Sequence, residues 1–195
     1  MSVQAANTIE ESWTIIHGWL EQNAPEILAN LNNAADQQAV TNLESTIQIT
    51  LPPDFVASTR IHDGQTDQSI GFEEGGEFLS LKRIADEWKV WKELLDSGDF
   101  AGITSEPVGA IKNDWWNPKW IPFTYDGSGN HLCIDLDPAA GGTPGQIITM
   151  WHDDADRRIV APNFQTWLSN LAIGLQNGDF VYSDNYGAIV PKEDA

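Results

Sequence analysis

The sequence is poor in cysteine and in basic residues. Cys133 is the one cysteine among 195 residues, which excludes an intramolecular disulfide and any zinc or redox motif built on Cys-x-x-Cys. Lys and Arg together number 10 against 29 Asp and Glu, and none of the ten precedes Arg60. The formal net charge of −19 would repel a phosphate backbone. The composition therefore argues against nucleic-acid binding and favours a cationic partner.

Long apolar runs and the short motifs of common enzymes are also missing. No stretch approaches the roughly 20 apolar residues of a membrane-spanning helix. The first residues, MSVQAANTIEESW, have neither the basic nor the apolar part of a secretory signal. The sequence contains no GxSxG elbow, Walker A loop or Rossmann GxGxxG fingerprint. We therefore expect a cytoplasmic protein that is not an enzyme and uses no membrane anchor, metal or cofactor.

Aromatic residues and clear periodic patterns are abundant. Nine tryptophans and a hydrophobic fraction of 41% predict a folded core, and we expect a single domain over residues 1–195. Apolar residues recur at helical spacing in five segments, which are 9–20, 25–31, 40–47, 81–95 and 163–175. Alternating apolar residues predict strands at 120–125 and 131–136 and a third strand within 142–151. This order indicates an α+β fold, with a polar tail, 183–195, that is expected to be peripheral and to fray.

The turn between the first two predicted strands has two interpretations. Counted from Asp126, its oxygen donors follow the spacing of an EF-hand calcium loop. These donors are Asp126, Ser128, Asn130, the carbonyl of Leu132, and Asp137. However, His131 stands where the loop needs glycine, and the flanking segments alternate like strands instead of helices. Because Asp, Asn and Gly are also the residues that tight turns favour, we expect a β-hairpin turn here.

Other residues could support chemistry if the fold brought them together. A pair of carboxylates on or beside the meander could serve as general acid and base; the candidates are Asp126, Asp135, Asp137, Asp153, Asp154 and Asp156. His152 precedes two aspartates and His62 precedes Asp63, but neither histidine has the spacing of paired metal ligands. Trp115, Trp116 and Trp120 could stack on sugar rings, pack in the core or contact a partner.

Four segments resemble one known family. They are NLESTIQITLPPDFVASTRIHDGQ (42–65), FLSLKRIADEWKVWKELLDSG (78–98), WWNPKWIPFTYDGSGNHLCIDLDPAAGGTPGQIITMWHDD (115–154) and NFQTWLSNL (163–171). Together they are similar to the fungal cell-wall-assembly regulator (killer-toxin-resistance) family, part of the SUKH superfamily. The resemblance covers residues from about 10 to 180, and the block at 115–154 is its most distinctive part.

This resemblance implies a fold and two kinds of role. It implies an α+β domain with a central antiparallel or mixed sheet, flanking helices and no catalytic residues. Fungal members are linked to glucan synthesis and cell-wall signalling as interaction proteins, whereas bacterial members are commonly immunity proteins that neutralise a toxin. Fungal members usually carry long polar flanks, which this sequence lacks. This difference from the fungal pattern favours the bacterial role.

We therefore predict a non-enzymatic interaction module, foremost an immunity-type protein whose acidic surface steers a cationic toxin domain. The alternatives are a regulator of cell-wall or glucan synthesis and a carbohydrate-binding or carbohydrate-active protein that uses the tryptophan cluster. The residues expected to contact a partner are Asp63, Trp115, Trp116, Asp126, His152, Asp153 and Asp154.

Overall fold

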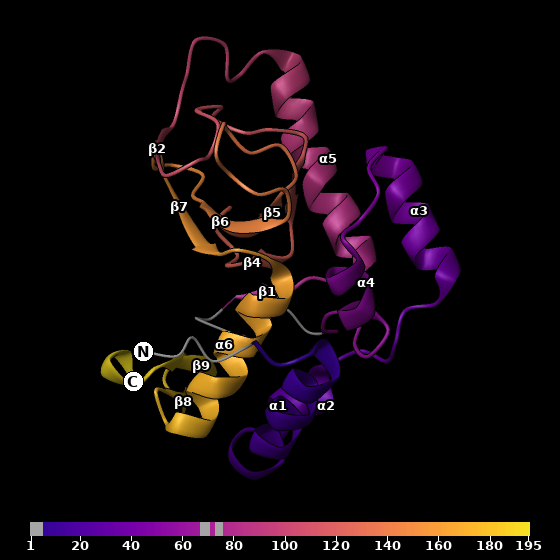
Figure 1. Cartoon of the computed structure of the whole chain (residues 1–195), viewed down its shortest axis with the longest axis vertical. Coiled ribbons are helices and arrows are strands. Elements are labelled where there is room, and N and C mark those ends of the chain that lie inside the picture. The colour runs from indigo at the N-terminus through magenta and orange to yellow at the C-terminus, as the bar shows by residue number, and fades with distance from the viewer. Residues whose placement is uncertain (1–5, 67–70, 73–75) are drawn as a thin grey trace.

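The computed structural model describes residues 6–66, 71–72 and 76–195 and shows an α+β fold with a mixed sheet (Figure 1). Its helices are α1 (Ile9–Asn23), α2 (Pro25–Asn30), α3 (Gln37–Ile47), α4 (Pro53–Thr59), α5 (Leu81–Ser97), α6 (Phe164–Asn177) and the 3-10 helix η1 (Lys192–Asp194). Its strands are β1 (Glu77–Phe78), β2 (Glu106–Val108), β3 (Trp120–Pro122), β4 (Thr124–Tyr125), β5 (His131–Asp135), β6 (Gln146–Met150), β7 (Asp156–Ala161), β8 (Phe180–Ser183) and β9 (Ala188–Pro191).

Local sequence signals set the helix boundaries. Thr8 and Glu11 form a capping box that satisfies two N–H groups at the start of α1. The side chain of Ser80 accepts a hydrogen bond from the N–H of Arg83 and so caps α5. Gly98 ends α5 with a φ of 86°, a left-handed conformation that glycine adopts without steric cost. The predicted helices at 9–20, 25–31, 40–47, 81–95 and 163–175 are confirmed within a few residues.

The main sheet has the strand order β2-β7-β6-β5-β3, in which β2 runs parallel to β7 and the other neighbours are antiparallel. The chain passes from β3 through Phe123 into β4, which pairs with β1. The N–H of Leu79 donates to the carbonyl of Phe123 at 2.9 Å, so β1 and Leu79 run along the edge that β3 and β4 form. The predicted hairpin and third strand are confirmed as β3–β5 and β6.

Helices cover both faces of the sheet. On one face Trp91 of α5 contacts His131 of β5, and on the other Phe123 packs against Trp167 of α6, with ring centroids 4.9 Å apart. Figure 1 shows α5 alongside the strands and α6 running from the sheet toward the end that holds α1 and α2. The strands β3, β5 and β6 are therefore buried on both sides, as Trp120 and Ile121, neighbours in β3, both show with 0% exposure, whereas Ile159 and Val160 of β7 are exposed.

The C-terminal segment differs from the expectation that it frays. Residues of β9 pair with β8 along their full length. Ala188 and Ile189 are fully buried, and Ile189 belongs to the main core. The prediction that residues 183–195 fray is wrong for β9, because the apolar stretch Ala188–Val190 provides enough burial to hold this strand against β8. The polar side chains that suggested fraying lie beyond it, in η1.

Candidate functional site

The tryptophan cluster lies inside the protein. Trp116 is 2% exposed and stacks on Trp91 at an interplanar angle of 18°, while Trp88 meets it edge-on. The indole N–H of Trp88 donates to the carbonyl of Pro118 at 2.8 Å, which ties α5 to the segment before β3. Trp116 and Trp120 are thus core residues, and their burial removes the sugar-stacking platform that the sequence suggested.

Trp115 has a different neighbour, Arg157, which is fully buried in β7. The guanidinium carbon lies 5.2 Å from the centre of the Trp115 ring. Its Nη atoms donate to the backbone carbonyls of Trp115, Asp154 and Asp156 at 2.7–2.9 Å. Burial lowers the pKa of Arg157. The Arg157 side chain thus links the segment before β3 to the start of β7. Nothing in the sequence pattern indicated that this arginine would be buried.

Asp126 holds the tight turn before β5. Its carboxylate accepts hydrogen bonds from the backbone N–H groups of Ser128, Gly129 and Asn130 at 2.8–3.2 Å. Burial acts to raise the pKa of Asp126, but the hydrogen bonds from Ser128 and Asn130 outweigh it and leave the pKa below its ordinary value. The carboxylate is therefore satisfied by its own turn, as the hairpin interpretation predicts. The EF-hand interpretation is not supported, because strands flank this turn.

His152 lies beside this turn. The side-chain oxygen of Asn130 accepts the backbone N–H of His152 at 2.9 Å, and the amide nitrogen of Asn130 donates to Asp126 at 2.7 Å. Asp153 follows on the same exposed loop, with an oxygen 3.6 Å from Nδ1 of His152. Three of the expected partner-binding residues thus come together. A cavity of about 60 Å³ lies next to Asp126 and Asn130, which is far smaller than the roughly 300–1,000 Å³ of metabolite sites.

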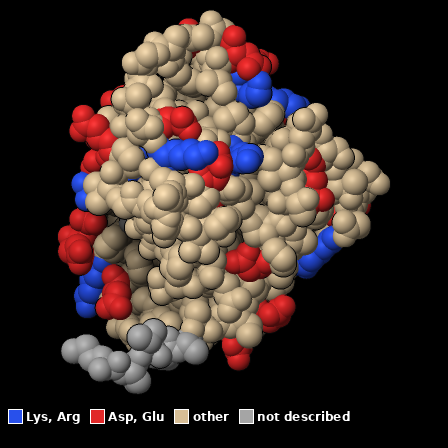
Figure 2. Space-filling view, turned by 45° about the horizontal axis from the view of Figure 1, so that its top comes forward, with Lys and Arg blue, Asp and Glu red and all other residues tan. Residues whose placement is uncertain are grey.

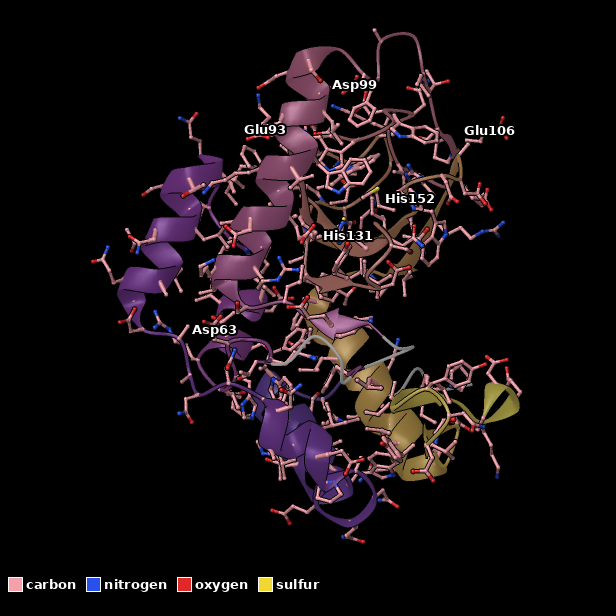
Figure 3. The ribbon with its side chains drawn as sticks, turned by 180° about the vertical axis from the view of Figure 1, so that it is seen from behind. Asp63, Glu93, Asp99, Glu106, His131 and His152 are labelled. Atoms are coloured by element: carbon pink, nitrogen blue, oxygen red, sulfur yellow. The ribbon has the colours of Figure 1, made fainter. Side chains whose placement is uncertain are left out.

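Asp63 lies in another part of the molecule. Its Oδ1 accepts the backbone N–H of Leu81 at 2.7 Å, at the first residue of α5. Burial raises the pKa of Asp63. Figure 3 shows Asp63 near the lower end of α5, well away from His152 and from Glu93 and Asp99 at the other end of that helix. The structure therefore does not gather the expected contact residues into one surface.

The carboxylates of β5 and its turn have structural partners. Asp135 is fully buried; Nε2 of Gln146 donates to it at 2.9 Å, and burial raises its pKa. Asp137 accepts from Nζ of Lys112 at 2.6 Å and from the side chain of Asn117, and the bond from Lys112 lowers its pKa. The two acids hold different segments together, so this arrangement offers no general acid and base facing a common substrate.

Figure 2 shows acidic side chains at many points of one face, with Lys and Arg lying among them. Several basic groups form ion pairs with acids: Arg158 lies 2.6 Å from Asp156, and Lys92 lies 2.5 Å from Asp96.

Within residues 6–66, 71–72 and 76–195, no helix is long and apolar enough to cross a membrane.

Comparisons with known proteins identify the chain's relatives. Residues 34–170 match the model of the SMI1 / KNR4 family (SUKH-1). A "Cell wall biosynthesis/cell cycle regulator" of Schizosaccharomyces pombe is 30% identical over 91% of this chain and 38% of its own length. A "Glucan synthesis regulatory protein" of Neurospora crassa is 27% identical over 95% of the chain and 42% of its own length.

A third relative has a similar name. The "Cell wall assembly regulator" of Saccharomyces cerevisiae is 24% identical over 89% of this chain and 42% of its own length. The chain thus spans about two fifths of the length of these relatives, whose names describe regulators and not enzymes. Because the family model matches more than half of the sequence, the chain belongs to the SMI1/KNR4 family (SUKH-1).

Proposed function

We propose that the chain is a non-enzymatic, protein-binding domain that regulates glucan synthesis and cell-wall assembly. The observation that carries this proposal is the similarity, over most of the chain, to three fungal proteins whose names describe such regulation. The sequence analysis predicted an immunity protein first and a regulator of cell-wall or glucan synthesis as an alternative. These relatives support the regulator better than the immunity protein. No relative named here refers to a toxin, so the toxin-neutralising role stays a prediction without further support.

The arrangement of side chains supports binding over catalysis. The candidate acids Asp126, Asp135 and Asp137 satisfy backbone or side-chain donors of the fold itself. Trp116 is buried in a ring cluster, so it is not free to stack on a sugar. Because these side chains make their contacts within the domain, the domain is suited to present a rigid surface to a protein partner.

The partner in this proposal is a protein with a basic binding surface. A net charge of −19 creates a field that accelerates the approach of such a partner and makes the association rate fall with salt. We place the role in the cytoplasm. The lone thiol of Cys133, fully buried in β5, is compatible with a reducing compartment.

A domain exchange in S. pombe tests the proposal. The segment of its regulator that aligns with this chain is replaced by the chain, and cells are treated with a glucan-degrading enzyme. We expect deletion of the segment to lower resistance to the enzyme and the exchange to restore it. The control carries the destabilising substitution Gly64→Ala in the inserted chain. If the inserted chain is present at normal levels and resistance is not restored, the proposed function is wrong.

A further inference from the structure

Two histidines from distant parts of the chain meet between α1 and the segment after α4. The Nε2 atoms of His17 and His62 are 2.6 Å apart, although 45 residues separate them. Both rings are half-buried. Each packs against Trp13, whose ring centre is 5.7 Å from that of His17 and 5.0 Å from that of His62. Packing on Trp13 therefore holds the two nitrogens facing each other.

The second nitrogen of His62 has a fixed partner. Its Nδ1 lies 2.6 Å from the backbone carbonyl of Asn32, and because a carbonyl accepts, Nδ1 carries the proton. In a neutral imidazole this leaves a lone pair on Nε2, directed at His17. The side chain of Asn32 in turn donates to the carbonyl of Asp63 at 2.8 Å. A histidine whose far nitrogen donates to a backbone carbonyl has the orientation that metal-ligating histidines use.

Glu21 adds a negative charge on the same face of α1, four residues after His17. Burial and the neighbouring His62 lower the pKa of His17, while Glu21 acts in the opposite direction. Glu21 is exposed, so its carboxylate remains in contact with solvent. In the part of the chain that the structure describes, no group of three or more His, Cys, Asp or Glu residues is arranged to hold a metal.

We propose that His17 and His62 form a two-histidine site for a divalent transition-metal ion, Zn²⁺ or Cu²⁺, with water completing the coordination. Imidazole nitrogen is a preferred ligand for both ions. A tetrahedral ion with Zn–N bonds of about 2.0–2.1 Å places two nitrogens roughly 3.3 Å apart. The rings at 2.6 Å therefore need to separate by less than about 1 Å. Such an ion replaces the proton that the two nitrogens share.

The site would join α1 to the connection between α4 and α5. That connection also carries Asp63, which accepts the first N–H of α5. An ion bound to the folded state and not to the unfolded chain stabilises the fold by mass action. The inference concerns His17 and His62 alone and does not depend on the proposed regulatory function.

Titration of the metal-free chain with Zn²⁺ alone, followed by calorimetry and by the melting temperature, tests the site. We expect saturable binding of one ion and a higher melting temperature. The variants His17→Gln and His62→Gln should each weaken binding by about tenfold or more. His152→Gln is the matched control, because His152 is exposed and, within the described residues, its side chain contacts Asp153 and Asn130 and no second histidine. This variant should bind like the unaltered chain.

A spectroscopic measurement keeps the test independent of whether the variants fold. With one equivalent of Cu²⁺, electron paramagnetic resonance of the unaltered chain should show coupling to two imidazole nitrogens. Absence of saturable Zn²⁺ binding to the unaltered chain would show that the pair is only a hydrogen bond and would overturn the proposal. So would equal binding by all three variants, or a copper spectrum without nitrogen coupling.

Discussion

Acidification is expected to destabilise the protein through His131. This histidine of β5 is 1% exposed, and its Nε2 accepts the indole N–H of Trp91 at 3.1 Å. Its Nδ1 therefore carries the proton and donates to the carbonyl of Thr124 at 2.7 Å. Burial lowers the pKa of His131 from 6.5 to about 4, although the hydrogen bond to Thr124 acts in the opposite direction. Both ring nitrogens of neutral His131 therefore make hydrogen bonds inside the protein.

The sign and size of the effect follow from these values. Between pH 6.5 and about 4 the unfolded chain binds a proton that the folded chain does not, so the free energy of unfolding falls as the pH falls. Each tenfold change in proton affinity is worth about 1.4 kcal/mol. Complete passage through this range therefore removes about 3 kcal/mol, which is a large share of the stability of a typical domain.

The loss of stability that His131 causes can be measured by urea unfolding at a series of pH values, with His131→Gln as the comparison. Glutamine has both a donor and an acceptor but does not titrate in this range. Between pH 7 and pH 4 the free energy of unfolding of the unaltered chain should fall by about 3 kcal/mol more than that of the variant. Parallel curves for the unaltered chain and His131→Gln would refute the argument.

Three further substitutions probe the fold and the turn. Gly64→Ala should cost more than about 3 kcal/mol by urea unfolding, because Gly64 has a φ of 64° and a Cβ would lie 2.3 Å from the backbone nitrogen of Ser80; a cost below 1 kcal/mol would contradict this packing. Trp116→Ala should cost about 3–5 kcal/mol in thermal unfolding, since it empties a ring cluster; a neutral result would mean that the indole is at the surface. Asp126→Ala should cost about 1–2 kcal/mol and speed hydrogen exchange at Ser128 and Asn130, and unchanged exchange would show that the carboxylate does not hold the turn.

The helices could be predicted from the sequence because their signals are local. Ser80 and Gly98 mark the ends of α5, and the apolar stripe between them matches the face that packs on the sheet. The turn at Asp126 followed from residue types that tolerate its backbone angles. The short strands β1 and β2, with two and three residues, are defined by partners far away in the chain, so no local pattern identified them.

The candidate site was harder to predict because it depends on side chains that meet across the fold. The sequence left open whether Trp116 and Trp120 pack in the core. Both are buried in the folded chain, where Trp116 stacks on Trp91 of α5. The burial of Arg157 depends on three backbone carbonyls that sequence spacing does not reveal. The contact of His17 with His62 likewise joins residues 45 positions apart.

The rate of β-glucan synthesis tests the central claim most directly. It is measured as labelled glucose incorporated into wall β-glucan in S. pombe cells whose regulator carries this chain in place of its own aligned segment. The account predicts a rate close to that of unaltered cells and well above that of cells lacking the segment. A rate equal to that of the deletion, with the inserted chain folded and present at normal levels, would contradict it.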